Sequence, residues 1–106
     1  MKKPVKMHVT YRPKPGKEEE LLGLIKKHGP ALQSTGLIVD GLPTIYRATD
    51  KRSGEQFFIE TFSRRDDEAP EAAHQMPEVM AVWEPMTPIL AGMQLAVVEE
   101  VGGQTT

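Results

Sequence analysis

Residues 55–90 constrain the fold more than any other part of the chain. A strand-like run at residues 55–63 is followed by an acidic stretch and a short helical piece that ends at His74. Pro77 then suits the first position of another helix, because that position needs no intrahelical N–H bond. A strand followed by two successive helical pieces is a distinctive order of elements. It restricts the fold, and it makes these residues candidates for the wall of a pocket.

The other strands follow from alternation and turn chemistry. Apolar and polar residues alternate over residues 5–12, which predicts a strand with one apolar face. Residues 44–49 and 56–63 are rich in β-forming residues and flank a polar turn, so they should form a hairpin. Arg47 and Glu60 would lie near each other across this hairpin as a charge pair. Two further extended pieces are expected at residues 37–39 and 94–101.

A first helix is predicted after the three glutamates at residues 18–20, which suit the positive end of a helix. Its apolar stripe contains Leu21, Leu22, Leu24, Ile25 and, one turn later, His28 or Leu32. The Gly29-Pro30 pair should kink or end this helix, because Pro30 has no backbone N–H and its ring crowds the preceding turn.

The second helical region is expected in two pieces. Asp66 or Asp67 can cap the first piece, and Pro77 begins the second. Pro85 should bend the second piece midway. One face of that piece would carry Val79, Trp83, Met86 and Leu90. The order strand, helix, strand, strand, broken helix, strand predicts an α+β, ferredoxin-like fold, an antiparallel sheet with helices on one face.

Length and composition exclude several classes of protein. A chain of 106 residues forms one domain, here residues 1–106 with a core of about 5–101 and a tail at 102–106. A net charge of -2 leaves no basic stripe for nucleic acid, and the absence of cysteine excludes disulfides and thiolate chemistry. With no apolar run long enough for a signal peptide or a membrane span, we expect a soluble, cytoplasmic protein.

Several segments resemble the antibiotic biosynthesis monooxygenase family. Residues 13–22 are similar to the start of the first helix in that family. Ala72-Ala73-His74, followed by Pro77 and Val79 and then by residues 85–90, is similar to its second half. The resemblance covers roughly residues 5–98. It implies a homodimer whose two sheets pack face to face as a dimeric α+β barrel, and the continuous apolar run at residues 57–59 suits a sheet buried on both faces.

The resemblance also implies a function. The leading hypothesis is a small-molecule pocket protein of the antibiotic biosynthesis monooxygenase type, whose reaction would be cofactor-independent oxidation of an aromatic or quinol substrate. The alternative is a non-catalytic, dimeric ligand-binding or stress-associated barrel that holds a small hydrophobic molecule. A third hypothesis, an isomerase or lyase, needs a base and an acid facing each other, which the sequence does not place. No cofactor is expected. Haem-degrading relatives place an asparagine on the first strand, and this chain contains none.

Two residues are the main site candidates. His74 would act as the base that removes a phenolic proton, giving an anion that reacts with oxygen; alternatively, it caps the C-terminal end of a short helix. Trp83 would stack against a flat ligand and donate its indole N–H; alternatively, it is a core residue on an apolar stripe.

Three more residues complete the set of candidate substrate-binding residues. His8 and Glu60 are expected on neighbouring strands, either as a base with its orienting carboxylate or as a cross-strand pair at an interface or edge. Arg47 would bind an anion or have a purely structural role. No metal is expected, because His8, His28 and His74 lie on different elements and show no zinc-binding spacing.

Overall fold

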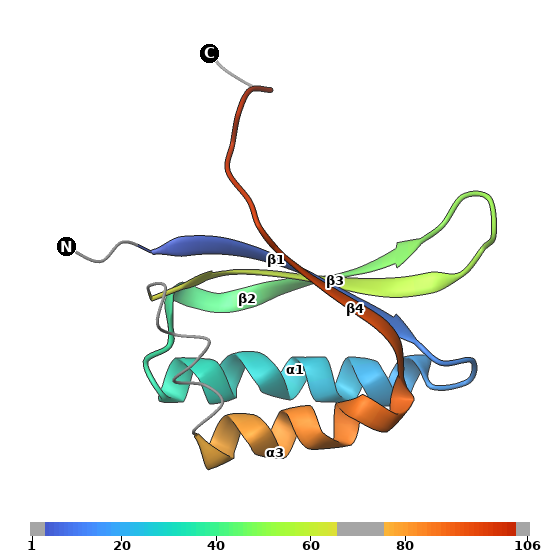
Figure 1. The fold of residues 1–106 in the computed structure, drawn as a ribbon, viewed down its shortest axis with the longest axis horizontal. Coiled ribbons are helices and arrows are strands. Elements are labelled where there is room, and N and C mark those ends of the chain that lie inside the picture. Colours follow the sequence, from blue (N-terminus) through green and yellow to red (C-terminus); the bar gives the residue numbers. More distant parts are fainter. Residues whose placement is uncertain (1–3, 66–75, 104–106) are drawn as a thin grey trace.

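The structure is a computed structural model that describes residues 4–65 and 76–103. Its four strands are β1 (Val5–Pro13), β2 (Ile38–Thr49), β3 (Gln56–Arg64) and β4 (Leu90–Val97), which form an antiparallel sheet in the order β2-β3-β1-β4. Helices α1 (Glu18–Ser34) and α3 (Pro77–Met86) cover one face of the sheet, and a short 3-10 helix, η1 (Thr87–Ile89), joins α3 to β4 (Figure 1). The predicted ferredoxin-like α+β fold is confirmed.

Strand register decides which side chains face the helices. On β1, Val9 lies opposite Glu60 of β3 and Leu95 of β4. Because side chains alternate across a strand, these three positions point to the same side of the sheet, the side covered by the helices. Residues between them point to the opposite side, which neither helix covers (Figure 1).

The core lies between the sheet and the two helices. A larger cluster joins β1, β3, α1, α3 and η1, and its buried members are Val9, Tyr11, Leu21, Ile25, Phe58, Val82, Met86 and Ile89. A smaller cluster consists of Leu32, Leu37, Ile38 and Val79. None of the helices in the described part of the chain combines the length and the apolar character needed to cross a membrane.

Helix α1 does not end at Gly29-Pro30, which removes one of the two alternatives predicted there, a kink or an end. It continues to Ser34 with Pro30 inside it. Leu32, beyond the proline, is buried in the smaller cluster, and this burial offsets the hydrogen bond that Pro30 cannot donate. Gly29 is also buried and packs directly against Pro43 of β2. Tertiary packing therefore overrides the local signal for a helix end.

Three other boundaries differ from the sequence prediction. β2 is one strand rather than two pieces, with a register shift between Val39 and Thr44. β4 spans Leu90–Val97, so it begins four residues before the predicted start. Pro85 lies in the last turn of α3, one residue before the α-helix ends and η1 begins, rather than at its middle. The helical piece predicted to end at His74 lies outside the described residues.

The packing of Gly29 gives a stability prediction with a matched control. In Gly29→Ala the new Cβ would lie 2.5 Å from Pro43 Cδ, so we expect a loss of about 1–3 kcal/mol in the free energy of unfolding. Gly23 lies in the same helix with nothing within 4 Å of its Cβ position, so Gly23→Ala should gain about 0.5–1 kcal/mol. Urea unfolding of both variants measures this, and a Gly29→Ala variant as stable as the parent would contradict it.

Candidate functional site

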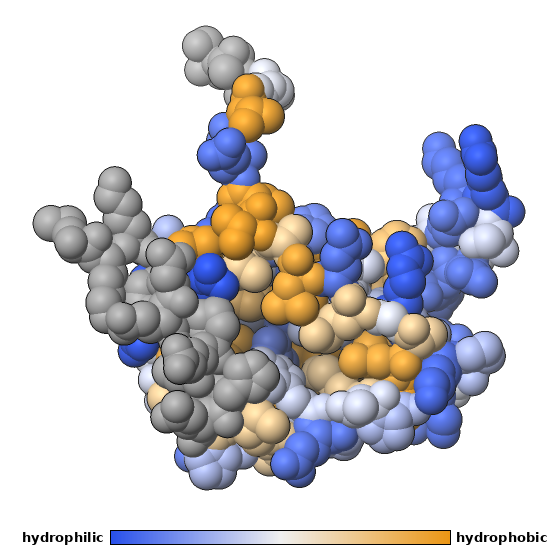
Figure 2. All heavy atoms as spheres, in the orientation of Figure 1, coloured by the Kyte–Doolittle hydropathy of each residue, from blue (hydrophilic) through white to orange (hydrophobic). Residues whose placement is uncertain are grey.

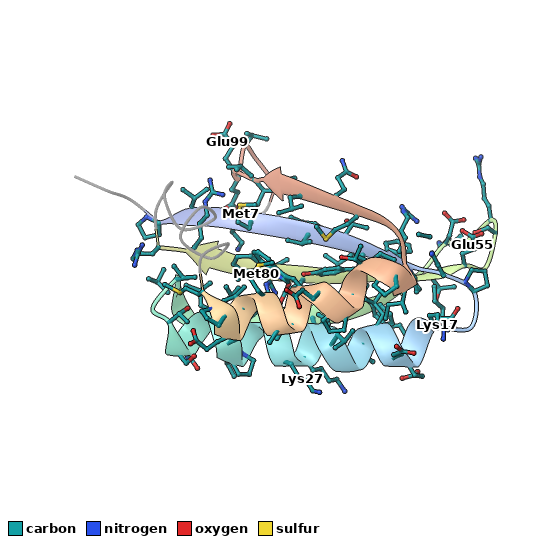
Figure 3. All side chains as sticks on the ribbon, turned by 60° about the horizontal axis from the view of Figure 1, so that its bottom comes forward. Met7, Lys17, Lys27, Glu55, Met80 and Glu99 are labelled. Atoms are coloured by element: carbon teal, nitrogen blue, oxygen red, sulfur yellow. The ribbon has the colours of Figure 1, made fainter. Side chains whose placement is uncertain are left out.

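A cavity of about 400 Å³ lies between the sheet and the helices. Its walls are mostly apolar, and four methionines from β1, α3 and β4 make them adaptable. Figure 3 shows Met7 on β1 and Met80 on α3, which line this space, whereas Lys27 points away from the sheet on the outer side of α1. The polar and aromatic residues that line it are Tyr11, His28, Phe62, Arg64, Trp83, Glu84 and Thr87.

The cavity opens along β4. Met93 and Leu95 of that strand pair with Tyr11 and Val9 of β1, so they point to the helix side of the sheet. They are nevertheless 50% and 58% exposed, and both line the cavity. Figure 2 shows hydrophobic side chains gathered along this strand. An apolar molecule would therefore meet an apolar entrance.

Tyr11, His28 and Glu60 form a buried polar cluster beside the cavity. The Tyr11 hydroxyl donates a hydrogen bond of 2.7 Å to Glu60 Oε1. His28 Nδ1 lies 3.0 Å from the same oxygen and 3.2 Å from Oε2. Glu60 is fully buried and His28 is only 3% exposed. These hydrogen bonds stabilise a carboxylate whose removal from water would otherwise cost several kcal/mol.

Three separate elements bring this cluster together. Glu60 lies opposite Val9 in the register, so Tyr11, two residues further along β1, is its diagonal neighbour on the same face. His28 comes from α1, one turn after the buried Ile25, and so faces the sheet. The sequence pattern places His28 on the helical stripe, but it predicts no role at the site for His28 or Tyr11. The available signal was a glutamate at an inward position between Phe58 and Phe62.

Tyr11 and His28, the two residues that contact Glu60, have different surroundings. Burial, with a further contribution from the Glu60 carboxylate and its hydrogen bond, raises the pKa of the Tyr11 hydroxyl well above its usual value. His28 Nε2 is buried and has no hydrogen-bond partner among the described residues. The His28 ring instead contacts aromatic rings, with centroid distances of 6.2 Å to Phe62 and 5.7 Å to Trp83.

Of the predicted site residues, Trp83 and Glu60 are near the cavity and His8 is not. Trp83 is half-buried and lines the cavity beside His28. His8 lies on a strand next to that of Glu60, as expected, but it pairs with Thr61. Alternation then turns its side chain to the uncovered face, away from Glu60. The predicted pairing of His8 with Glu60 was therefore wrong. The histidine that contacts Glu60 is His28.

Arg47 also has a different partner from the one predicted. It pairs with Phe58 across the hairpin, one step along the helix side from Glu60. Its guanidinium forms an exposed ion pair of 3.0 Å with Glu19 of α1 and a 3.3 Å hydrogen bond to Gln56. The predicted charge pair with Glu60 was wrong, and Arg47 does not line the cavity. His74 lies outside the described residues.

No group of three or more His, Asp or Glu side chains within residues 4–65 and 76–103 has an arrangement suited to a metal ion. The buried polar cluster contains one histidine, His28, and one carboxylate, Glu60. His28 Nδ1 and the Glu60 carboxylate already contact each other.

Searches by sequence find no matching protein-family model and no curated relative. The fold, in contrast, matches many solved structures. A protein from Chloroflexus aurantiacus provisionally named an antibiotic biosynthesis monooxygenase has a TM-score of 0.63 at 18% identity, over 97% of this chain and 98% of that one. Rv0793 from Mycobacterium tuberculosis has a TM-score of 0.68 at 13% identity, over 97% and 100%. At3g17210 from Arabidopsis thaliana has a TM-score of 0.71 at 13% identity, over 96% and 100%.

These similarities define a class of fold. The chain is a ferredoxin-like α+β domain of the kind found in proteins named antibiotic biosynthesis monooxygenases, and the match extends over nearly its whole length. The resemblance predicted from the sequence is thus confirmed for the fold. Because one fold hosts many activities, the reaction has to be argued from the site.

The buried Tyr11 hydroxyl gives a stability prediction. Tyr11→Phe removes a hydrogen bond to a carboxylate and leaves the ring in place, so we expect a loss of about 1.5–3 kcal/mol in unfolding free energy at pH 7. The raised pKa keeps Tyr11 protonated in the folded protein, whereas the unfolded chain ionises near pH 10. The stability that Tyr11 contributes is therefore present below about pH 10 and lost as the pH rises further.

Urea unfolding of both proteins between pH 8 and 11 measures this effect. The stability advantage of the parent over Tyr11→Phe should shrink above about pH 10, at up to about 1.4 kcal/mol per pH unit. An advantage that stays constant over this range would show that Tyr11 ionises alike in the folded and unfolded chains.

Proposed function

We propose that the protein binds a small aromatic or quinol molecule in the cavity and oxidises it with molecular oxygen without a cofactor. The observation that carries this proposal is the contact of His28, a histidine held by a carboxylate, with Trp83 in a mostly apolar cavity. Such a site accepts a flat ring by stacking and offers it a single basic nitrogen.

The chemistry asks little of the protein. Removing a proton from a phenol gives an electron-rich anion that reacts with oxygen directly. A hydroquinone gives up two protons and two electrons to become a quinone, and O₂ takes up both and becomes hydrogen peroxide. In a monooxygenation, an activated CH₂ group becomes a carbonyl, with the second oxygen atom leaving as water. The protein contributes the base, the orientation and a site shielded from water.

Two histidines are candidates for the base. His74 was assigned this role from the sequence resemblance and keeps it as a prediction. His28 is the candidate that lies beside Glu60 and lines the cavity. Separate substitution of the two histidines distinguishes them.

Oxygen uptake with a panel of dihydroxyarenes tests the activity. We expect uptake that depends on protein concentration and that falls by about a hundredfold or more in a variant lacking the base, since a positioned base contributes about 10²–10⁴ in rate. His28→Gln and His74→Ala are to be measured side by side, with circular dichroism to confirm that each is folded. An absence of uptake with every substrate in the panel would count against the oxidase proposal.

A second candidate function is non-catalytic binding of a small hydrophobic or aromatic molecule. It is favoured by the mostly apolar lining of the cavity. A ligand that raises the melting temperature without being converted supports this function, because binding to the folded state alone stabilises it.

The cytoplasm remains the expected compartment, because the sequence shows no apolar run of the length that a signal peptide or a membrane span needs.

We further propose that two copies pair through the sheet face that the helices leave uncovered. That face carries half-buried Phe57 and Ile59 of β3, with Tyr46 of β2, which is 54% exposed, beside them. A second copy would bury these side chains, which suits a chain with a small core of its own.

Light scattering at micromolar concentration tests the dimer. We expect a mass near twice 11.8 kDa, decreasing toward 11.8 kDa in Ile59→Asp, because the carboxylate would be buried unpaired. Thr49→Asp, at an exposed position on the helix side of β2, is the matched control and should leave the mass unchanged. A parent protein with a mass near 11.8 kDa would remove the paired-sheet arrangement.

A further inference from the structure

The contacts of His28 contain information about its protons. Both of its close contacts are with the carboxylate oxygens of Glu60, and the nearer one, at 3.0 Å, is with the oxygen that already accepts the Tyr11 hydroxyl. An oxygen that receives two such contacts is an acceptor for both. His28 Nδ1 therefore carries a hydrogen and donates it to Glu60.

The other ring nitrogen supports the same assignment. His28 Nε2 is buried with no partner among the described residues and lies in a ring that contacts Phe62 and Trp83. A buried N–H without an acceptor is rarer in proteins than an acceptor that lacks a donor. A neutral ring with its hydrogen on Nδ1 leaves a lone pair on Nε2 and no orphaned donor.

We propose that His28 Nε2 is the hydrogen-bond acceptor of the cavity and that its ligand is an aromatic molecule with a free, acidic hydroxyl group, such as a phenol or a quinol. The Glu60 carboxylate is a positioning group that fixes the tautomer through Nδ1–H, and Tyr11 is a positioning group that holds the carboxylate. This inference rests on the proposed function in one respect, because both concern the same cavity. It concerns binding alone and does not require that the ligand be oxidised.

The geometry explains why a hydroxyl is selected. An aromatic ring can lie against Trp83 and the methionine walls, contacts that any flat apolar molecule makes. The His28 Nε2 lone pair is a buried acceptor without a partner among the described residues, and its shielding from water strengthens a hydrogen bond that a ligand donates to it. A phenol satisfies the lone pair, whereas its methyl ether leaves the lone pair unpaired and adds bulk.

Glu60→Gln is expected to move the hydrogen of the His28 ring from one nitrogen to the other. The amide oxygen can still accept from Tyr11, but the amide nitrogen would donate to His28 Nδ1. The histidine hydrogen would then move to Nε2, and the cavity would present a donor in place of an acceptor. Glu78, an exposed carboxylate in the first turn of α3, does not line the cavity, so Glu78→Gln is the matched control.

Nitrogen-15 NMR of the unmodified protein is the first test. The chemical shifts of the His28 ring nitrogens, assigned by their loss in His28→Gln, should show a hydrogen on Nδ1 and a bare Nε2. A bare Nδ1 with a hydrogen on Nε2 would overturn the proposal. The shifts are measured on the unmodified protein, and His28→Gln serves only to assign them.

Binding of 2-naphthol and of 2-methoxynaphthalene, followed by fluorescence, is the second test. We expect the naphthol to bind about tenfold more tightly or better, a ratio that corresponds to about 1.4 kcal/mol. The ratio should fall to about one in Glu60→Gln and remain unchanged in Glu78→Gln. Equal affinities in the unmodified protein, or an unchanged ratio in a folded Glu60→Gln, would overturn it.

Failure of this inference is distinguishable from failure of the proposed function. A protein that prefers the naphthol but consumes no oxygen retains the hydroxyl-binding site and loses the oxidase activity. A protein that consumes oxygen but shows no preference for the hydroxyl retains the activity and loses the role proposed here for His28.

Discussion

The arrangement of this protein depends on one buried carboxylate. Glu60 lies at the centre of β3 with no exposed surface, a position where an apolar side chain would be cheaper to bury. It is held by the Tyr11 hydroxyl from β1 and by His28 from α1, so a single group links two strands and a helix. Removing either partner would leave a buried acceptor short of a donor, which makes all three positions sensitive to change.

Much of the fold could be predicted because its signals are local. Alternation over residues 5–12, the apolar run at residues 57–59 and Pro77 at a helix start each indicate the element in which they occur. The failures come from tertiary packing. Gly29-Pro30 carries a strong signal for a helix end, yet burial of Leu32 extends α1, and no local rule measures that burial. Likewise, β4 begins at Leu90 because it pairs with Pro13 of β1, a contact between residues distant in the chain.

The site was predictable only in part. Glu60 and Trp83 could be selected from the sequence, since one is a charge in an apolar strand and the other is the only tryptophan. Their partners could not, because a shift of one residue in strand register moves a side chain to the other face. His8 is one residue away from Val9, the position opposite Glu60, so its side chain points to the other face of the sheet. His28 reaches the carboxylate only because α1 lies across β3 with that face inward, and helix docking is not encoded in any short motif.

The position of β4 joins two properties that are usually separate. In the described part of the chain it is an edge strand of the sheet, and its exposed methionine and leucine also form the entrance of the cavity. An apolar edge strand is a template for pairing with another chain, the step that begins aggregation. A molecule seated in the entrance would cover the same side chains. A molecule bound in the cavity would therefore also reduce the apolar surface that this edge presents to another chain.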